Sequence, residues 1–99
     1  MYTAIQARNI ANEKYNHDYY KLYRWYVASI MRRITHATKR GYTQTDFVIN
    51  STKRTNMNVL RQIAQELTAY GYKTDVRVEA SQDGKHKYGV LEVRWDAQD

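Results

Sequence analysis

Tyr19–Gly41 reads YYKLYRWYVASIMRRITHATKRG, and together with the residues before it, from Thr3 onward, it decides the fold. The chain has no proline, and the first glycine is Gly41. Apolar side chains recur here at steps of three and four, which places them along one face of an α-helix. This stripe consists of Tyr15, Tyr19, Leu22, Tyr23, Tyr26, Ile30, Ile34 and Ala37.

The stretch predicts one long helix over about residues 3–40. Thr3 and Gln6 form a capping-box pattern at its start, and Gly41 suits the left-handed turn that ends a helix. Residues 12–18 include weak helix formers, so the helix would kink or break there if it does so anywhere. A continuous helix would be about 55 Å long, which is too long for a compact domain of this size. Either the helix breaks, or its outer part packs on another copy of the chain.

The rest of the chain predicts three strands and a second helix. Short alternating runs predict strands over residues 43–50, 73–80 and 88–95. Apolar residues at helical spacing predict a helix over 55–70, with Thr55 as its N-cap. Gly71 and Tyr72 then follow as a Schellman stop.

This order of elements predicts an α+β fold, α-β-α-β-β, in one domain over residues 1–99. The last strand is the most apolar, so we place it in the middle of the sheet. The expected sheet is three-stranded and mixed, in the order first, third, second strand. The long helix and the second helix are expected on one face of it.

Charge predicts the register of the last two strands. Asp83-Gly84 is a hairpin-turn signal, but a two-residue turn there would set Asp75 opposite Glu92. Slipping the pairing by two residues sets Arg77 opposite Glu92 and Asp75 opposite Arg94, which is complementary. We therefore expect the slipped register and a longer loop.

Composition indicates a cytoplasmic domain. The 99 residues suit a single core, and 42% are hydrophobic and 26% charged, as in ordinary globular proteins. There is no cysteine, so disulfides and thiolate chemistry are excluded. No long apolar run predicts a membrane span, and the N-terminus lacks the apolar block of a signal peptide.

The formal net charge of +6 is unevenly distributed. Residues 1–54 carry +7, whereas residues 55–99 carry −1. A basic helical half points to an anionic partner.

Signatures of catalysis are missing from the sequence. His17, His36 and His86 are far apart and lack a metal-ligand spacing. Asp75, Glu79 and Glu92 suit cross-strand ion pairs better than acid–base catalysis. There is no phosphate-binding glycine loop, nucleophile elbow or HExxH helix. We expect no enzyme activity, no metal and no cofactor.

The best candidate site is a basic cluster at the end of the long helix. It would bind phosphate, with backbone donors from the start of the second helix added. The alternative is a solvated helix end stabilised by the helix dipole. The cluster consists of Arg32, Arg33, His36, Lys39 and Arg40, and Lys53 and Arg54 would join it.

The aromatic residues predict a second surface. Tyr20 and Trp25 lie off the apolar stripe, where they would be costly to leave in water. With Tyr15 and Tyr19 they form the predicted contact of a homodimer or higher oligomer. Tyrosines at this spacing can also stack nucleotide rings, although core or interface roles are more usual.

Several segments resemble a widespread group of short phage-encoded proteins. They are Ala7-Arg8, IMRRITHATKRG at residues 30–41, LTAYGY at residues 67–72 and LEVRW at residues 91–95. The resemblance implies a phage or prophage context, in which small single-domain proteins often bind something of the host.

The sequence thus predicts a non-enzymatic protein that binds or sequesters an anionic, phosphate-bearing ligand. A nucleotide and a nucleic acid both fit. The first alternative is an inhibitor that binds a host or defence protein, and the second is a virion or assembly component.

Overall fold

The computed structural model describes residues 4–96, with the side chains of residues 5–17 left out of the description. It confirms the α+β fold and the predicted order of elements, and each boundary lies within one residue of the predicted one. The elements are α1 (Ala4–Lys39), β1 (Gln44–Ile49), α2 (Arg54–Ala69), β2 (Lys73–Ala80) and β3 (Lys87–Arg94).

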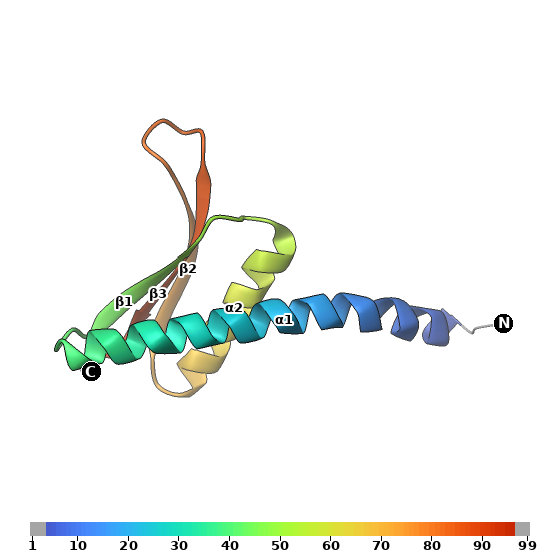
Figure 1. Cartoon of the computed structure of the whole chain (residues 1–99), viewed down its shortest axis with the longest axis horizontal. Coiled ribbons are helices and arrows are strands. Elements are labelled where there is room, and N and C mark those ends of the chain that lie inside the picture. Colours follow the sequence, from blue (N-terminus) through green and yellow to red (C-terminus); the bar gives the residue numbers. More distant parts are fainter. Residues whose placement is uncertain (1–3, 97–99) are drawn as a thin grey trace.

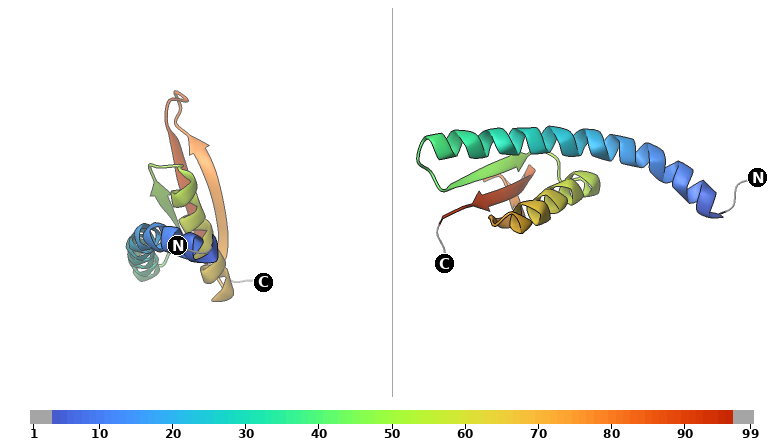
Figure 2. Two further views of the ribbon diagram at one scale, coloured as in Figure 1. Left: turned by 90° about the vertical axis from the view of Figure 1, so that its right-hand side faces the viewer. Right: turned by 90° about the horizontal axis from the view of Figure 1, so that it is seen from below.

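α1 is one continuous helix of 36 residues, without a break at residues 12–18. At about 1.5 Å per residue it is about 54 Å long. It curves gently, and its N-terminal part extends past the end of α2 (Figure 1 and Figure 2). The Cα radius of gyration is therefore 16.5 Å, whereas a compact chain of this length has about 13 Å.

Both helices end as the sequence predicts. Gly41 has φ +81° and Gly71 has φ +100°, a left-handed conformation that glycine adopts without steric cost. The Tyr72 N–H donates to the Leu67 carbonyl at 3.1 Å, which is the Schellman bond. The predicted N-cap Thr55 is wrong, because α2 already begins at Arg54 and Lys53 caps it without a side-chain hydrogen bond. The predicted cap Thr3 lies outside the described residues.

The sheet has the predicted order, β1-β3-β2. It is antiparallel throughout, so the prediction of a mixed sheet is wrong. The reason is that β3 lies between β1 and β2 and runs antiparallel to both of them. β1 and β2 point the same way, but they do not pair.

The slipped register is also wrong. Asp75 lies opposite Glu92, and Arg77 lies opposite Val90. Arg77 offsets the expected repulsion because its guanidinium contacts both carboxylates. Its Nη1 lies 3.0 Å from Asp75 Oδ2 on the same strand and 3.0 Å from Glu92 Oε1 on the neighbouring strand. Its Nε lies 2.7 Å from Glu79 Oε1. One guanidinium thus contacts three carboxylates and offsets part of their repulsion. The expected longer loop is present, because residues 81–86 connect the two strands.

The core lies between the sheet and the two helices, which cover one face (Figure 2). α1 packs on α2 and β1, and α2 packs on β2 and β3. Leu60, Leu91 and Val93 are fully buried in this layer. The β2–β3 hairpin continues beyond the helices as a projecting arm (Figure 1).

Tyrosines connect the two helices. The Tyr19 hydroxyl donates to Gln62 Oε1 and the Tyr23 hydroxyl to Glu66 Oε1. The Tyr26 hydroxyl accepts from Asn56 Nδ2 at 2.8 Å, and the Tyr26 ring is buried against Phe47. Much of the tyrosine stripe is therefore helix–helix contact within one chain.

Candidate functional site

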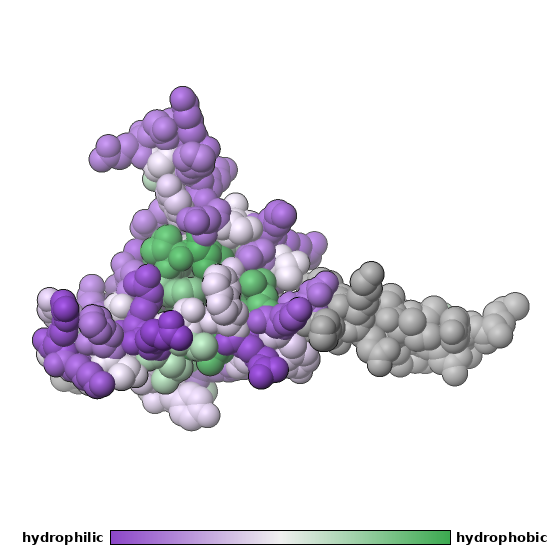
Figure 3. Space-filling model, viewed as in Figure 1, coloured by the Kyte–Doolittle hydropathy of each residue, from purple (hydrophilic) through white to green (hydrophobic). Residues whose placement is uncertain are grey.

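A basic hollow of about 630 Å³ lies between the C-terminal half of α1 and β1. One wall comes from successive turns of α1, and the other comes from the chain that returns through the Gly41 turn into β1. Hydrophilic residues cover this end of α1 (Figure 3). The hollow is lined by Ser29, Arg32, Arg33, His36, Ala37, Arg40, Tyr42, Gln44, Thr45 and Phe47.

Four of the seven predicted binding residues line this hollow together: Arg32, Arg33, His36 and Arg40. A fifth, Lys39, lines a shallower hollow next to it, and Arg32 and His36 line that one as well. All five are exposed. The structure thus brings the helical part of the predicted cluster together.

Lys53 and Arg54 lie elsewhere. β1 carries the chain back along α1, so α2 starts beside Tyr26, where Asn56 makes its hydrogen bond. Tyr26 precedes His36 by ten residues, which is about 15 Å along the helix. The start of α2 therefore adds no backbone donors to the basic hollow.

The cations around the hollow lack acidic partners. Between Tyr19 and Thr45 the chain carries six lysines and arginines and no aspartate or glutamate. Among the residues that the structure describes, the ion pairs involve Arg77 and Arg94 and none of these six cations.

The helix dipole explains part of this cluster. Its effect falls off within the last turn, where His36 and Lys39 lie. Arg32 and Arg33 are about two turns from the helix end, outside that range. Arg33 is held by the strand instead: its Nη1 donates to the Asp46 carbonyl at 3.2 Å, and its guanidinium carbon lies 6.0 Å from the centroid of the Phe47 ring.

Two exposed aromatic residues flank the cations. Tyr42 lines the hollow with 59% of its surface exposed. Trp25 is 68% exposed and precedes Ser29 by four residues, so it lies on the same edge of α1. Tyr42 was not predicted as a site residue, although its position directly after the helix-ending Gly41 was a usable signal. Trp25 was predicted to lie in an oligomer contact, and the described residues of this chain leave its ring exposed.

The other three residues predicted at an oligomer interface are Tyr15, Tyr19 and Tyr20. Tyr19 faces α2 of its own chain, and Tyr20 is 62% exposed. Tyr15 belongs to the residues whose side chains are not described.

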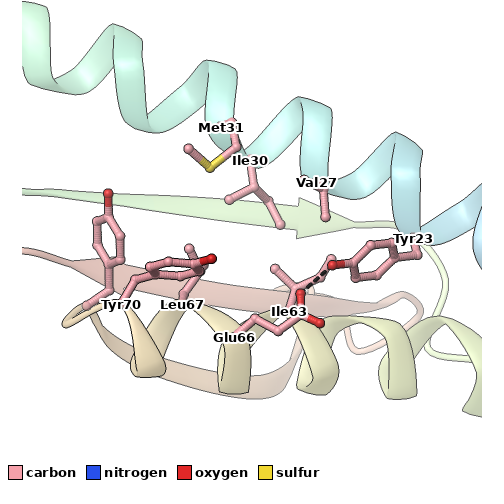
Figure 4. Close-up of a pocket in the computed structure, with 9 residues that line it drawn as sticks. Tyr23, Val27, Ile30, Met31, Ile63, Glu66, Leu67 and Tyr70 are labelled. Atoms are coloured by element: carbon pink, nitrogen blue, oxygen red, sulfur yellow. Dashed lines mark hydrogen bonds between the residues drawn. The ribbon is translucent and has the colours of Figure 1, made fainter.

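A second, apolar groove of about 770 Å³ runs between α1 and α2. Side chains from both helices converge on it, and Tyr23 meets Glu66 at one end (Figure 4). That hydrogen bond, together with burial, raises the pKa of Tyr23 to about 12. The lining residues are Tyr23, Val27, Ile30, Met31, Ile63, Glu66, Leu67, Tyr70 and Tyr72.

Comparisons with protein families, curated proteins and solved structures find no match for this chain. Within the described residues, no three side chains of the metal-binding types gather into a group that could hold an ion. None of the described helices combines the length and apolar character that crossing a membrane requires.

Proposed function

We propose that this protein is a non-enzymatic binding protein for single-stranded nucleic acid, in the phage context that its sequence resemblance implies. The observation that carries the proposal is the set of cations without acidic partners around the basic hollow. Arginines that have no acidic partner among the described residues are well suited to phosphate oxygens, which they contact through two parallel hydrogen bonds.

The shape of the site favours a strand over a free nucleotide. Small ligands are usually held in pockets that bury most of their surface. Here the cations are all exposed, and the edge from Trp25 to Arg40 extends over about 22 Å of α1 at about 1.5 Å per residue. A groove that follows a phosphate backbone has this open, elongated form.

The aromatic residues give the bases a place to stack. Trp25 lies at one end of the edge and Tyr42 near the other, and both rings are mostly exposed. Stacking on an aromatic side chain contributes about 1–3 kcal/mol per base and accepts any sequence. Cations between two aromatic rings therefore support binding with little sequence preference.

The test is the affinity of a fluorescently labelled single-stranded oligonucleotide, measured by anisotropy at low salt. We expect the variant with Arg32→Ala, Arg33→Ala and Arg40→Ala to bind about ten- to a hundredfold more weakly than wild type, because three phosphate contacts are lost. The matched control is Lys73→Ala, Lys85→Ala and Lys87→Ala, which removes the same charge at exposed positions outside α1. Thermal melting of both variants checks that they are folded.

The control should bind almost as well as wild type. Equal losses in the two variants would mean that net charge alone attracts the strand, which contradicts a site at the basic hollow. A mononucleotide that binds as tightly as the oligonucleotide would contradict the choice of a strand as ligand.

A further inference from the structure

The apolar groove between α1 and α2 is open on one side. Met31 is 44% exposed and Tyr70 83% exposed at its rim. The groove continues into a neighbouring hollow of about 340 Å³, where Tyr70 and Tyr72 meet Ile34, Thr38 and Trp95. Together the two hollows form an apolar trough along α1 from Tyr23 to Thr38. Fifteen helical steps make this trough about 22 Å long.

The opposite half of α1 extends away from the domain. Among the side chains that the structure describes, the first contact of α1 with α2 is that of Tyr19 with Gln62. Before that point, residues 4–18 continue past α2, and no other described element lies beside them (Figure 1 and Figure 2). This projecting segment is also about 22 Å long. A helix of this length is marginal in water without a packing partner.

We propose that a second copy of this chain occupies the trough. The two α1 helices pack antiparallel about a two-fold axis near Tyr20, so that residues 4–18 of each copy lie along the trough of the other. The trough and the projecting segment have the same length and lie on the two sides of Tyr20. A single interface therefore covers both the trough and the projecting segment. Two-fold symmetry limits the assembly to a dimer. With α2 and its symmetry mate, the interface is a four-helix bundle.

Tyr20 has the position and exposure that such an axis requires. It precedes Val27 by seven residues and Met31 by eleven, which places it on the trough side of α1. Its ring is 62% exposed, so two copies of it can meet at the axis. Trp25 lies about 140° around the helix from Tyr20 at 3.6 residues per turn. The basic hollow, on the Trp25 edge, therefore stays open in the dimer, and each dimer carries two of them.

The first test is the mass of the wild-type protein by native mass spectrometry at micromolar concentration. The expected result is twice the 11.8 kDa of one chain. A monomer across the accessible concentration range would overturn the proposal and leave the trough for a different occupant. Because this test uses no nucleic acid, its outcome is independent of the proposed function.

The second test locates the axis with single cysteines, since the chain has none of its own. Under mild oxidation, Tyr20→Cys is expected to form a disulfide-linked dimer, because a residue at a two-fold axis faces its own copy. Trp25→Cys is the control, at a similarly exposed site on another side of α1, and it should stay unlinked. Equal linking of the two variants would contradict this axis. Met31→Glu places a charge in the trough. This variant should have the mass of a monomer in native mass spectrometry, and its circular dichroism should show that it is folded.

Discussion

At the scale of single residues, Gly89 illustrates how closely the core is packed. It lies near the start of β3, and a β-carbon there would lie 2.7 Å from the Met57 sulfur and 2.8 Å from Ile49 Cγ1. The methionine end can move, but Ile49 is buried and β-branched, so it has little freedom. The strand therefore passes under α2 only because this residue has no side chain.

We expect Gly89→Ala to lower the free energy of unfolding by about 1–3 kcal/mol, as overpacked cores do. Urea denaturation followed by circular dichroism measures this. Gln82→Ala, at an exposed position of the same hairpin, should leave the stability nearly unchanged. Equal stability of Gly89→Ala and wild type would show that Ile49 and Met57 make room without cost.

Arg77 contacts both carboxylates that the hairpin register places opposite each other, Asp75 and Glu92. Its contacts with Glu79, Asp75 and Glu92 raise its pKa above the usual arginine value, so it remains charged at every accessible pH. We expect Arg77→Met to lower the melting temperature, because Asp75 and Glu92 then face each other without the guanidinium that contacts both. Arg94→Met is the comparison, since Arg94 makes one longer contact of 3.7 Å with Glu92, and it should have the smaller effect. The difference between the two variants should shrink in high salt, which screens exposed charges.

At the scale of elements, the contact between α1 and α2 includes Tyr23, whose hydroxyl has a raised pKa. Tyr23 donates to Glu66, which raises the Tyr23 pKa from 10.0 to about 12. A group with a raised pKa in the folded state stabilises the protein below its unfolded pKa and loses this contribution as the pH rises through the folded value.

Between pH 10 and pH 12, wild type should therefore lose stability that Tyr23→Phe does not lose. The measurement is the melting temperature of both proteins across this range. The difference in melting temperature between wild type and Tyr23→Phe should narrow as the pH rises. A constant gap would mean that the Tyr23–Glu66 hydrogen bond does not hold the proton in the folded state.

Periodicity was enough to predict the elements, because α1, α2 and the strands each have a clear apolar pattern, and Gly41 and Gly71 follow the two helices. The register of β2 and β3 could not be predicted from the charges of directly opposite residues. Arg77 contacts three carboxylates, and none of them lies directly opposite it. Within the candidate site, helical spacing placed Arg32, His36 and Arg40 together. Helical spacing could not predict the position of Lys53 and Arg54, because their separation from the cluster depends on the direction of β1.

At the scale of the whole molecule, charge is sorted between two faces. The outer face of the sheet carries a row of three carboxylates, since Asp46 and Asp75 both lie opposite Glu92. Cations that form no ion pair within the described part of the chain lie along α1. Arg77 and Arg94 lie beside two of these carboxylates and offset part of their charge. We therefore expect a polyanion to be drawn to the edge that holds the basic hollow.

The most direct measurement of nucleic-acid binding at this edge is the salt dependence of oligonucleotide affinity. If Arg32, Arg33, Lys39 and Arg40 each contact a phosphate, the logarithm of the binding constant should fall against the logarithm of salt concentration with a slope of about −3. Removing the three arginines should reduce the slope by about two. A slope near zero in wild type, or the same slope in the variant, would contradict phosphate binding at the basic hollow.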